Sequence, residues 1–259
     1  MSIKKVLLLF LVPVFMAVSL SMKSPGEGFM DNQLKNSRVL VAKNEKDAVL
    51  KKLCQEKGIA YPIQDMFIRV FKKEAQLEVW AKPVKGASHV LLKNYKVCVV
   101  SGGLGPKRQE GDGQTPEGFY HINDYNPLSS FYLSLGVSYP NASDKIKTTN
   151  KARPGGLIYI HGNCVSIGCM PIEDDGIKEV YWMAVQAKEA GQGEIGVHIF
   201  PFKMNETNMK WANDTYKTNP ALLSFWANLL PGYQYFEKHK TVPGIKVGKK
   251  GEYVWAKGK

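Results

Sequence analysis

Three short segments between residues 66 and 103 constrain the fold more than any other part of the chain. They read MFIRVFKK (66–73), QLEVWAKP (76–83) and HVLLKNYKVCVVSGG (89–103). Each is rich in β-branched and aromatic residues and is bounded by turn formers, which is the pattern of β-strands. GGLIYIHG (155–162) and EIGVHIFPF (194–202) have the same character. These segments are consistent with a mainly β domain, although they do not decide its topology.

A helix is expected before the first strand. Asn44 is a candidate N-cap for a helix over 45–58, and Cys54 falls on its apolar face, where it is interpreted as a packed thiol. Residues 23–43 are mixed polar and are expected to form a loose lead-in.

Two further helices are expected after the strands. Asp174 or Asp175 can cap a helix that stops at Gly191, and Pro220 begins a probable final helix in the tail. His198 lies in the middle of a predicted strand and is interpreted as a structural histidine.

The first nineteen residues resemble a secretory signal peptide. Lys4 and Lys5 precede an apolar run over 6–18, and Ala17-Val18-Ser19 is a small-x-small cleavage pattern. The run is short for a membrane-spanning helix, which needs about 20 apolar residues. We therefore predict export to the periplasm or cell envelope, with an uncleaved N-terminal anchor as the alternative.

The charge and the arginine content of the chain limit the classes of partner that it is expected to bind. The formal net charge is +12, but only four basic residues are arginine, the side chain that nucleic-acid readers favour for base contacts. Export also argues against nucleic acid. The lysine excess fits either an anionic envelope surface or simple solubility. The chain is expected to be a monomer without a cofactor.

The loop HGNCVSIGCMP, residues 161–171, carries one histidine and two of the four cysteines. A zinc site on His161, Cys164 and Cys169 lacks the second ligand pair that structural zinc sites usually have. A Cys164–Cys169 disulfide is closable, but it would hide both thiols. Cys98 lies in a predicted strand and is interpreted as core. The remaining interpretation is a catalytic cysteine–histidine pair.

Two features favour Cys169 over Cys164 as the nucleophile. Gly168 just before it permits a positive φ and a close approach of substrate to the backbone. The amides of Gly168 and Cys169 could then face a developing oxyanion. His161 ends a strand eight positions earlier, and the intervening loop can return the chain so that the two side chains meet.

HGNCVSIGCMPI resembles the signature of the L,D-transpeptidase catalytic-domain (YkuD-domain) family, in which a strand-end His-Gly precedes Ser-x-Gly-Cys. Three other segments resemble the YafK-like branch of that family: GPKRQEGDGQTPEGFYHI, SLGVSYPNASDK and FPFKMNE…FWANLLPGYQYFEKHK. The resemblance covers roughly residues 60–255. It implies a mixed β-sandwich with a few helices and a helical C-terminal extension, an α+β fold that is mainly β.

The resemblance also implies roles. Cys169 matches the catalytic cysteine and His161 its general base, while Gly168, Ser166 and Gly162 match positions that shape the oxyanion pocket. The common motif is Ser-His-Gly-Cys followed by a hydrophobic residue and an arginine. Here isoleucine replaces the second histidine, and Met-Pro-Ile follows the cysteine.

Because the arginine is missing, other basic residues are candidate partners for a carboxylate of the substrate. The candidates are Lys107, Arg108 and Arg153; exposed basic residues in loops are the alternative interpretation.

The resemblance implies an exported cysteine acyl-transferase that acts on peptidoglycan stem peptides, with an amine of a second stem, an envelope protein or an amino acid as acceptor. A hydrolase using the same residues is one alternative, and a non-catalytic envelope-binding module is another. The expected organisation is a signal peptide over 1–19, a lead-in with a short helix over 20–60, a catalytic domain over 61–204 and a helical extension over 205–259.

Overall fold

The computed structural model describes residues 28–255, so the predicted signal peptide lies outside the described residues. The helices are α1 (Phe29–Leu34), α2 (Ser37–Glu56), α3 (Ala142–Lys147), α4 (Glu173–Glu189), α5 (Glu206–Thr215) and α6 (Pro220–His239). The strands are β1 (Met66–Phe71), β2 (Gln76–Ala81), β3 (Val90–Lys96), β4 (Gly118–Asn126), β5 (Ser134–Val137), β6 (Ile158–His161), β7 (Met170–Pro171), β8 (Gly196–Phe200), β9 (Ile245–Val247) and β10 (Tyr253–Trp255).

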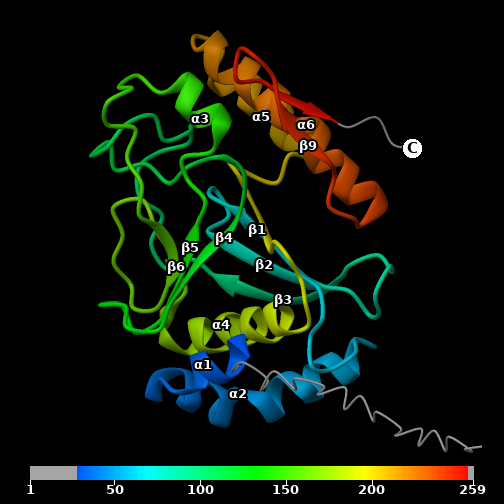
Figure 1. Cartoon of the computed structure of the whole chain (residues 1–259). Helices are drawn as coiled ribbons and strands as arrows, with labels where there is room; N and C mark the ends of the chain where they lie inside the picture. The colour runs from blue at the N-terminus through cyan, green and yellow to red at the C-terminus, as the bar shows by residue number, and fades with distance from the viewer. Residues whose placement is uncertain (1–27, 256–259) are drawn as a thin grey trace, which may run out of the picture.

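Eight of these strands form one curled sheet in the order β3-β2-β1-β8-β4-β5-β6-β7, and β9 pairs with β10 (Figure 1). The β1–β8 and β6–β7 pairs are parallel, and the other pairs in the large sheet are antiparallel. The predicted mixed α+β fold is therefore confirmed. All five predicted strand segments contain a strand, and His161 ends its strand as expected.

Helix α4 packs its apolar side against one face of the sheet, and α1 and α2 cover α4 from outside (Figure 1). Helices α5 and α6 and the β9–β10 hairpin lie at the other end of the molecule in Figure 1. There an aromatic cluster that includes Phe71, Phe119, Phe200 and Trp226 joins them to the sheet. Within residues 28–255, no helix is long and apolar enough to span a membrane.

The expectation of a loose lead-in was wrong. Helix α2 begins at Ser37, and the side chain of Asn36 caps it by accepting a hydrogen bond from the Arg38 amide. Asn44, the predicted cap, lies inside the helix. Val39 and Ala42 are fully buried, so packing carries the helix through a stretch whose polar composition suggested a loop. Cys54 is buried and unbonded, as predicted.

Helix α4 also starts earlier than predicted. Its first residue is Glu173, and Ile172 occupies the N-cap position without a side-chain cap. Asp174 instead accepts a hydrogen bond from the Asn163 amide at 2.8 Å, which ties the preceding loop to the helix. The predicted start of α6 at Pro220 is confirmed, and Asn219 caps it, but packing continues the helix past Pro231 to His239.

Candidate active site

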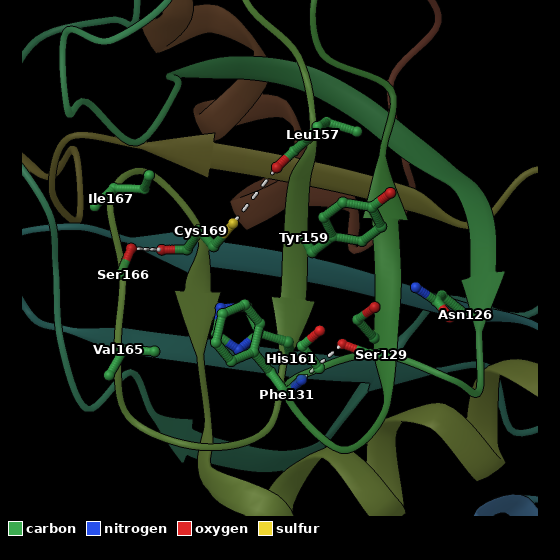
Figure 2. A pocket seen from close by; sticks show the side chains of 12 residues that line it. Asn126, Ser129, Phe131, Leu157, Tyr159, His161, Val165, Ser166, Ile167 and Cys169 are labelled. Carbon is green, nitrogen blue, oxygen red and sulfur yellow. Dashed lines mark hydrogen bonds between the residues drawn. The ribbon is translucent and has the colours of Figure 1, made fainter.

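A cavity of about 540 Å³ opens on one side of the curled sheet, beside β5, β6 and the loop that joins β6 to β7 (Figure 2). Its lining residues are Asn126, Ser129, Ser130, Phe131, Ser134, Leu157, Tyr159, His161, Val165, Ser166, Ile167 and Cys169. The lining falls between residues 126 and 169, so the described part of the tail after residue 205 does not line the cavity. His161 and Cys169 therefore line the same cavity.

Strand geometry explains this placement. Successive side chains of a strand alternate between its two faces. Ile158 and Ile160 of β6 are therefore in the core, while Tyr159 and His161 face the cavity. The parallel pairing of Ile160 with Met170 sets Cys169 beside Tyr159, just before β7. His161 is thus the last residue of β6, and Cys169 directly precedes the neighbouring parallel strand β7.

His161 is held in one orientation. Its Nδ1 lies 2.5 Å from the carbonyl oxygen of Gly162. Because a carbonyl can only accept, Nδ1 carries the proton and Nε2 keeps its lone pair in the neutral ring. Phe131 stacks on the imidazole with the ring centroids 4.6 Å apart. Burial lowers the pKa of His161, and the Gly162 carbonyl opposes this only in part. At neutral pH His161 is therefore a neutral ring that can accept a proton.

Cys169 is a free thiol that is partly exposed in the cavity. Its thiol donates to the carbonyl oxygen of Leu157 at 3.6 Å, as Figure 2 shows. Burial raises the pKa of Cys169, while the Tyr159 amide and the charge of Lys107 act in the opposite direction. The resting pair is thus a neutral thiol and a neutral imidazole.

Cys164 is not available for chemistry, because it forms a disulfide with Cys98, with Cα atoms 5.8 Å apart. The interpretation of Cys98 as a core strand residue was therefore wrong: β3 ends at Lys96, and Cys98 lies beyond it. The disulfide also removes Cys164 from the two alternatives weighed above, a Cys164–Cys169 bridge and a zinc site. Sequence spacing could not reveal a bond between cysteines 66 positions apart.

The turn before Cys169 is fixed by a serine. Ser166 Oγ accepts from the Gly168 amide at 3.0 Å and donates to the Cys169 carbonyl oxygen at 2.8 Å. The predicted positive φ of Gly168 is confirmed, at +140°. However, a Cβ at this position would lie 2.9 Å from the Gln114 carbonyl oxygen, so the close approach is to a neighbouring loop. The Gly168 amide is also engaged by Ser166, contrary to its expected place in the oxyanion pocket.

Gly162 is required for a different reason. A Cβ here would lie 2.4 Å from Asp174 Oδ1 and 2.7 Å from the Phe131 carbonyl oxygen. Its amide donates to the Leu133 carbonyl oxygen at 3.2 Å. Because Gly162 has no side chain, the end of β6 can pack directly against the Phe131 backbone and against Asp174 in the first turn of α4.

The three predicted basic residues all have carboxylate partners within the chain. Lys107 is buried with Nζ 2.6 Å from Asp112, and Arg153 lies 2.8 Å from Glu110. Arg108 lies 3.5 Å from Asp144. Their contact with substrate stays a prediction, and none of them is among the cavity-lining residues.

The sequence-based interpretation missed three residues that shape the site. Tyr159 shares the cavity face of β6 with His161, and Ser134 of β5 lies directly opposite His161 in the strand register. Phe131 covers the imidazole ring. The two-residue alternation along IYIH could have identified Tyr159, whereas Ser134 and Phe131 depend on a strand pairing that the sequence does not show.

Comparison with known proteins places the chain in a family. The L,D-transpeptidase catalytic domain (YkuD) matches residues 65–190. Proteins named "Putative L,D-transpeptidase YafK" from Escherichia coli strains K12 and O157:H7 are each 38% identical over 194 residues, which is 74% of this chain and 74% of theirs.

Two solved structures are also similar. The helical cell shape determining protein Pgp2 from Campylobacter jejuni is 19% identical with a TM-score of 0.42, covering 78% of this chain and 80% of that chain. Bd1075 from Bdellovibrio bacteriovorus is 20% identical with a TM-score of 0.40, covering 73% of this chain and 79% of that chain. On the strength of its identity to the YafK proteins and of the domain match, this chain belongs to the L,D-transpeptidase catalytic-domain (YkuD) family.

Proposed function

We propose that this protein is an exported cysteine acyl-transferase that acts on peptidoglycan stem peptides, with Cys169 as nucleophile and His161 as general base. The observation that carries the proposal is the state of the cysteines at the cavity. Cys169 is free and lines the cavity with His161, whereas Cys164 is bonded to Cys98. Family membership supplies the substrate class.

The proposed first step is acylation. Rotation of the Cys169 side chain about its Cα–Cβ bond turns the sulfur from Leu157 towards His161. Nε2 of His161 takes the thiol proton as the sulfur attacks the carbonyl carbon at the L-centre of the third stem residue. The Cys169 amide is the proposed donor to the oxyanion. The imidazolium then returns its proton to the departing amine of the terminal residue, which leaves a thioester.

In the second step an amine attacks the thioester and His161 accepts its proton; the C–S bond then breaks, and the departing Cys169 sulfur takes that proton back from the imidazolium. Water attacking the same carbon would give hydrolysis, which is the second candidate. The cavity is open to solvent and several of its lining side chains are serine hydroxyls, so water has access to the thioester. The partition between amine and water therefore decides between a transferase and a hydrolase.

Product analysis tests this proposal. Purified protein is incubated with a tetrapeptide-stem muropeptide, with and without an added D-amino acid, and the products are identified by mass spectrometry. A cross-linked dimer or an exchanged terminal residue is expected for the transferase, and a tripeptide for the hydrolase. An unchanged tetrapeptide in every condition would contradict both activities. Cys169→Ala serves as the inactive control.

The division of the chain is likewise a proposal: a catalytic domain over 61–204 and an extension over 205–259 that supports it. Export, with the first nineteen residues as signal peptide or anchor, belongs to the same proposal. An amine-bearing envelope protein or amino acid is the proposed acceptor, and the monomeric state stays a prediction.

A further inference from the structure

A row of residues crosses the cavity face from β4 to Cys169. Asp124 of β4 pairs with Gly136 of β5, and Gly136 pairs with Tyr159 of β6. The β6–β7 register continues the row from Tyr159 to Cys169. Side chains of paired residues point to the same side of a sheet. Asp124, Tyr159 and Cys169 therefore share the face that carries the nucleophile.

Gly136 leaves a gap in the middle of this row. A Cβ there would lie 2.7 Å from Asp124 Cβ and 2.7 Å from Asn123 Oδ1. Because the position has no side chain, the ring of Tyr159 extends from β6 over the neighbouring strand β5 (Figure 2). Burial raises the pKa of the Tyr159 phenol, and the charge of Asp124 and its hydrogen bonding raise it further. The register supports the same placement, since only Gly136 separates the Asp124 carboxylate from the Tyr159 phenol in the row.

The lining of the cavity carries no acidic side chain and no lysine or arginine, so a carboxylate close to it stands out. None of the twelve lining residues is Asp, Glu, Lys or Arg. Asp124 is exposed at the end of the row. None of the ion pairs formed within residues 28–255 uses it. Asp124 is not itself a lining residue, but it is a carboxylate outside these ion pairs that lies in the same row, on the side of the lining residue Tyr159 away from Cys169.

We propose that Asp124, positioned by Tyr159, binds a primary ammonium group of the substrate while Cys169 attacks the acyl carbon. This inference rests on the proposed function. Three strand spacings of about 4.8 Å separate the two ends of the row, roughly 14 Å between backbones. The side chains at both ends shorten this gap to one that a diamino acid side chain can bridge. The ammonium belongs either to the third residue of the acyl donor or to the incoming acceptor.

The donor arm of the test uses two synthetic tetrapeptide stems, one with lysine and one with Nε-acetyl-lysine at the third position. The rate of Cys169 acylation is followed by intact-protein mass spectrometry. Asp124→Asn is expected to lower kcat/KM for the lysine donor by about tenfold, the scale of one hydrogen bond to a charged group, and to leave the acetylated donor within about twofold. Asp124→Glu, which keeps the charge, is expected to retain the preference.

Tyr159→Phe keeps the ring and removes the hydroxyl. Because Tyr159 acts through the carboxylate, this change is expected to raise KM more for the lysine donor than for the acetylated donor, with little change in kcat for either. Glu194→Gln is the matched control, since it removes an exposed carboxylate that lies outside the row. It is expected to change neither donor.

The acceptor arm starts from the preformed thioester. If the ammonium belongs to the acceptor, it is the amine that does not attack, so Asp124→Asn slows attack by the diamino acid D-lysine by about tenfold and leaves attack by D-alanine and by water unchanged. An equal effect on both donors and on water would reveal a merely structural role and overturn the inference, as would no effect on either arm. If wild-type protein forms no thioester with any stem, the proposed function itself is wrong. This outcome can be told apart from the two that overturn only the role of Asp124.

Discussion

At the scale of single residues, the site depends on a neutral pair. His161 donates Nδ1–H to the Gly162 carbonyl and is buried against Phe131, so its neutral form is favoured and its Nε2 keeps a free lone pair. Burial also favours the uncharged thiol of Cys169. In the proposed reaction the proton therefore moves during the attack rather than before it, which is the definition of general base catalysis.

This arrangement predicts the pH dependence of acylation. The pKa of His161 lies below its ordinary value of 6.5, so kcat/KM should stay high at neutral pH and fall with a midpoint below 6.5 as the ring gains a proton. In His161→Gln the base is lost, and the rate should fall about 100-fold or more at pH 7. It should then rise with pH until the thiol ionises above its ordinary 9.0. A wild-type midpoint above 7, or an unchanged profile in the variant, would refute the assignment.

At the scale of elements, the loop that joins β6 to β7 is fastened at three points. The Cys98–Cys164 disulfide ties it to the segment after β3, and Asp174 ties it to the first turn of α4. Ser166 closes the turn just before Cys169. Cys169, the proposed nucleophile, therefore lies at the end of a loop that is held by one covalent bond and several hydrogen bonds.

The disulfide should contribute substantially to stability, because it links cysteines 66 positions apart and so restricts the unfolded chain. The double change Cys98→Ser with Cys164→Ser is expected to lower the free energy of unfolding by about 2–4 kcal/mol in urea titrations. Wild-type protein in reductant should behave like the double variant. Identical midpoints for oxidised and reduced wild type would show that the bond contributes nothing.

Local patterns predicted the elements better than the links between them. The content of β-branched and aromatic residues identified the strand that ends at His161, and Pro220 marked the start of α6. By contrast, Val39 and Ala42 are helical because α4 lies beneath them, and Cys98 is bonded because the fold brings Cys164 to it. The glycine at 168 correctly predicted a positive φ. It did not predict which group approaches the backbone, since the Gln114 carbonyl belongs to a loop distant in sequence.

At the scale of the whole molecule, a buried ion pair joins the tail to the loop behind the nucleophile. Lys72 Nζ lies 3.0 Å from Glu117 Oε1 and donates to the carbonyl oxygens of Gly105 and Thr115. Glu117 Oε2 accepts from Trp226 of α6 at 2.8 Å. Because the same loop places the Gln114 carbonyl against Gly168, α6 supports the catalytic turn without lining the cavity.

Acid should destabilise the whole fold through His198. This ring lies between Phe67 and Phe119, with centroids 4.6 Å and 4.7 Å away, and burial lowers its pKa to about 3. The unfolded histidine binds a proton near pH 6.5, so stability is full above that pH and is lost as pH falls towards 3.

The contribution of His198 to this loss of stability can be measured with a variant that has no titratable side chain at position 198. Between pH 7 and pH 4.5, the drop in unfolding free energy should be smaller in His198→Phe than in wild type by about 2–3 kcal/mol. Urea titrations at the two pH values measure the difference. Equal drops in the two proteins would show that this histidine is not the group responsible.

The central claim is that Cys169 carries the acyl group, and trapping the thioester tests it most directly. Protein quenched in acid during turnover of a tetrapeptide stem is weighed intact, digested and mapped. We expect an adduct of the stem without its terminal residue, located on Cys169. It should be absent from Cys169→Ala and present in the double change Cys98→Ala with Cys164→Ala. An adduct on any other residue, or one that persists in Cys169→Ala, would contradict the account.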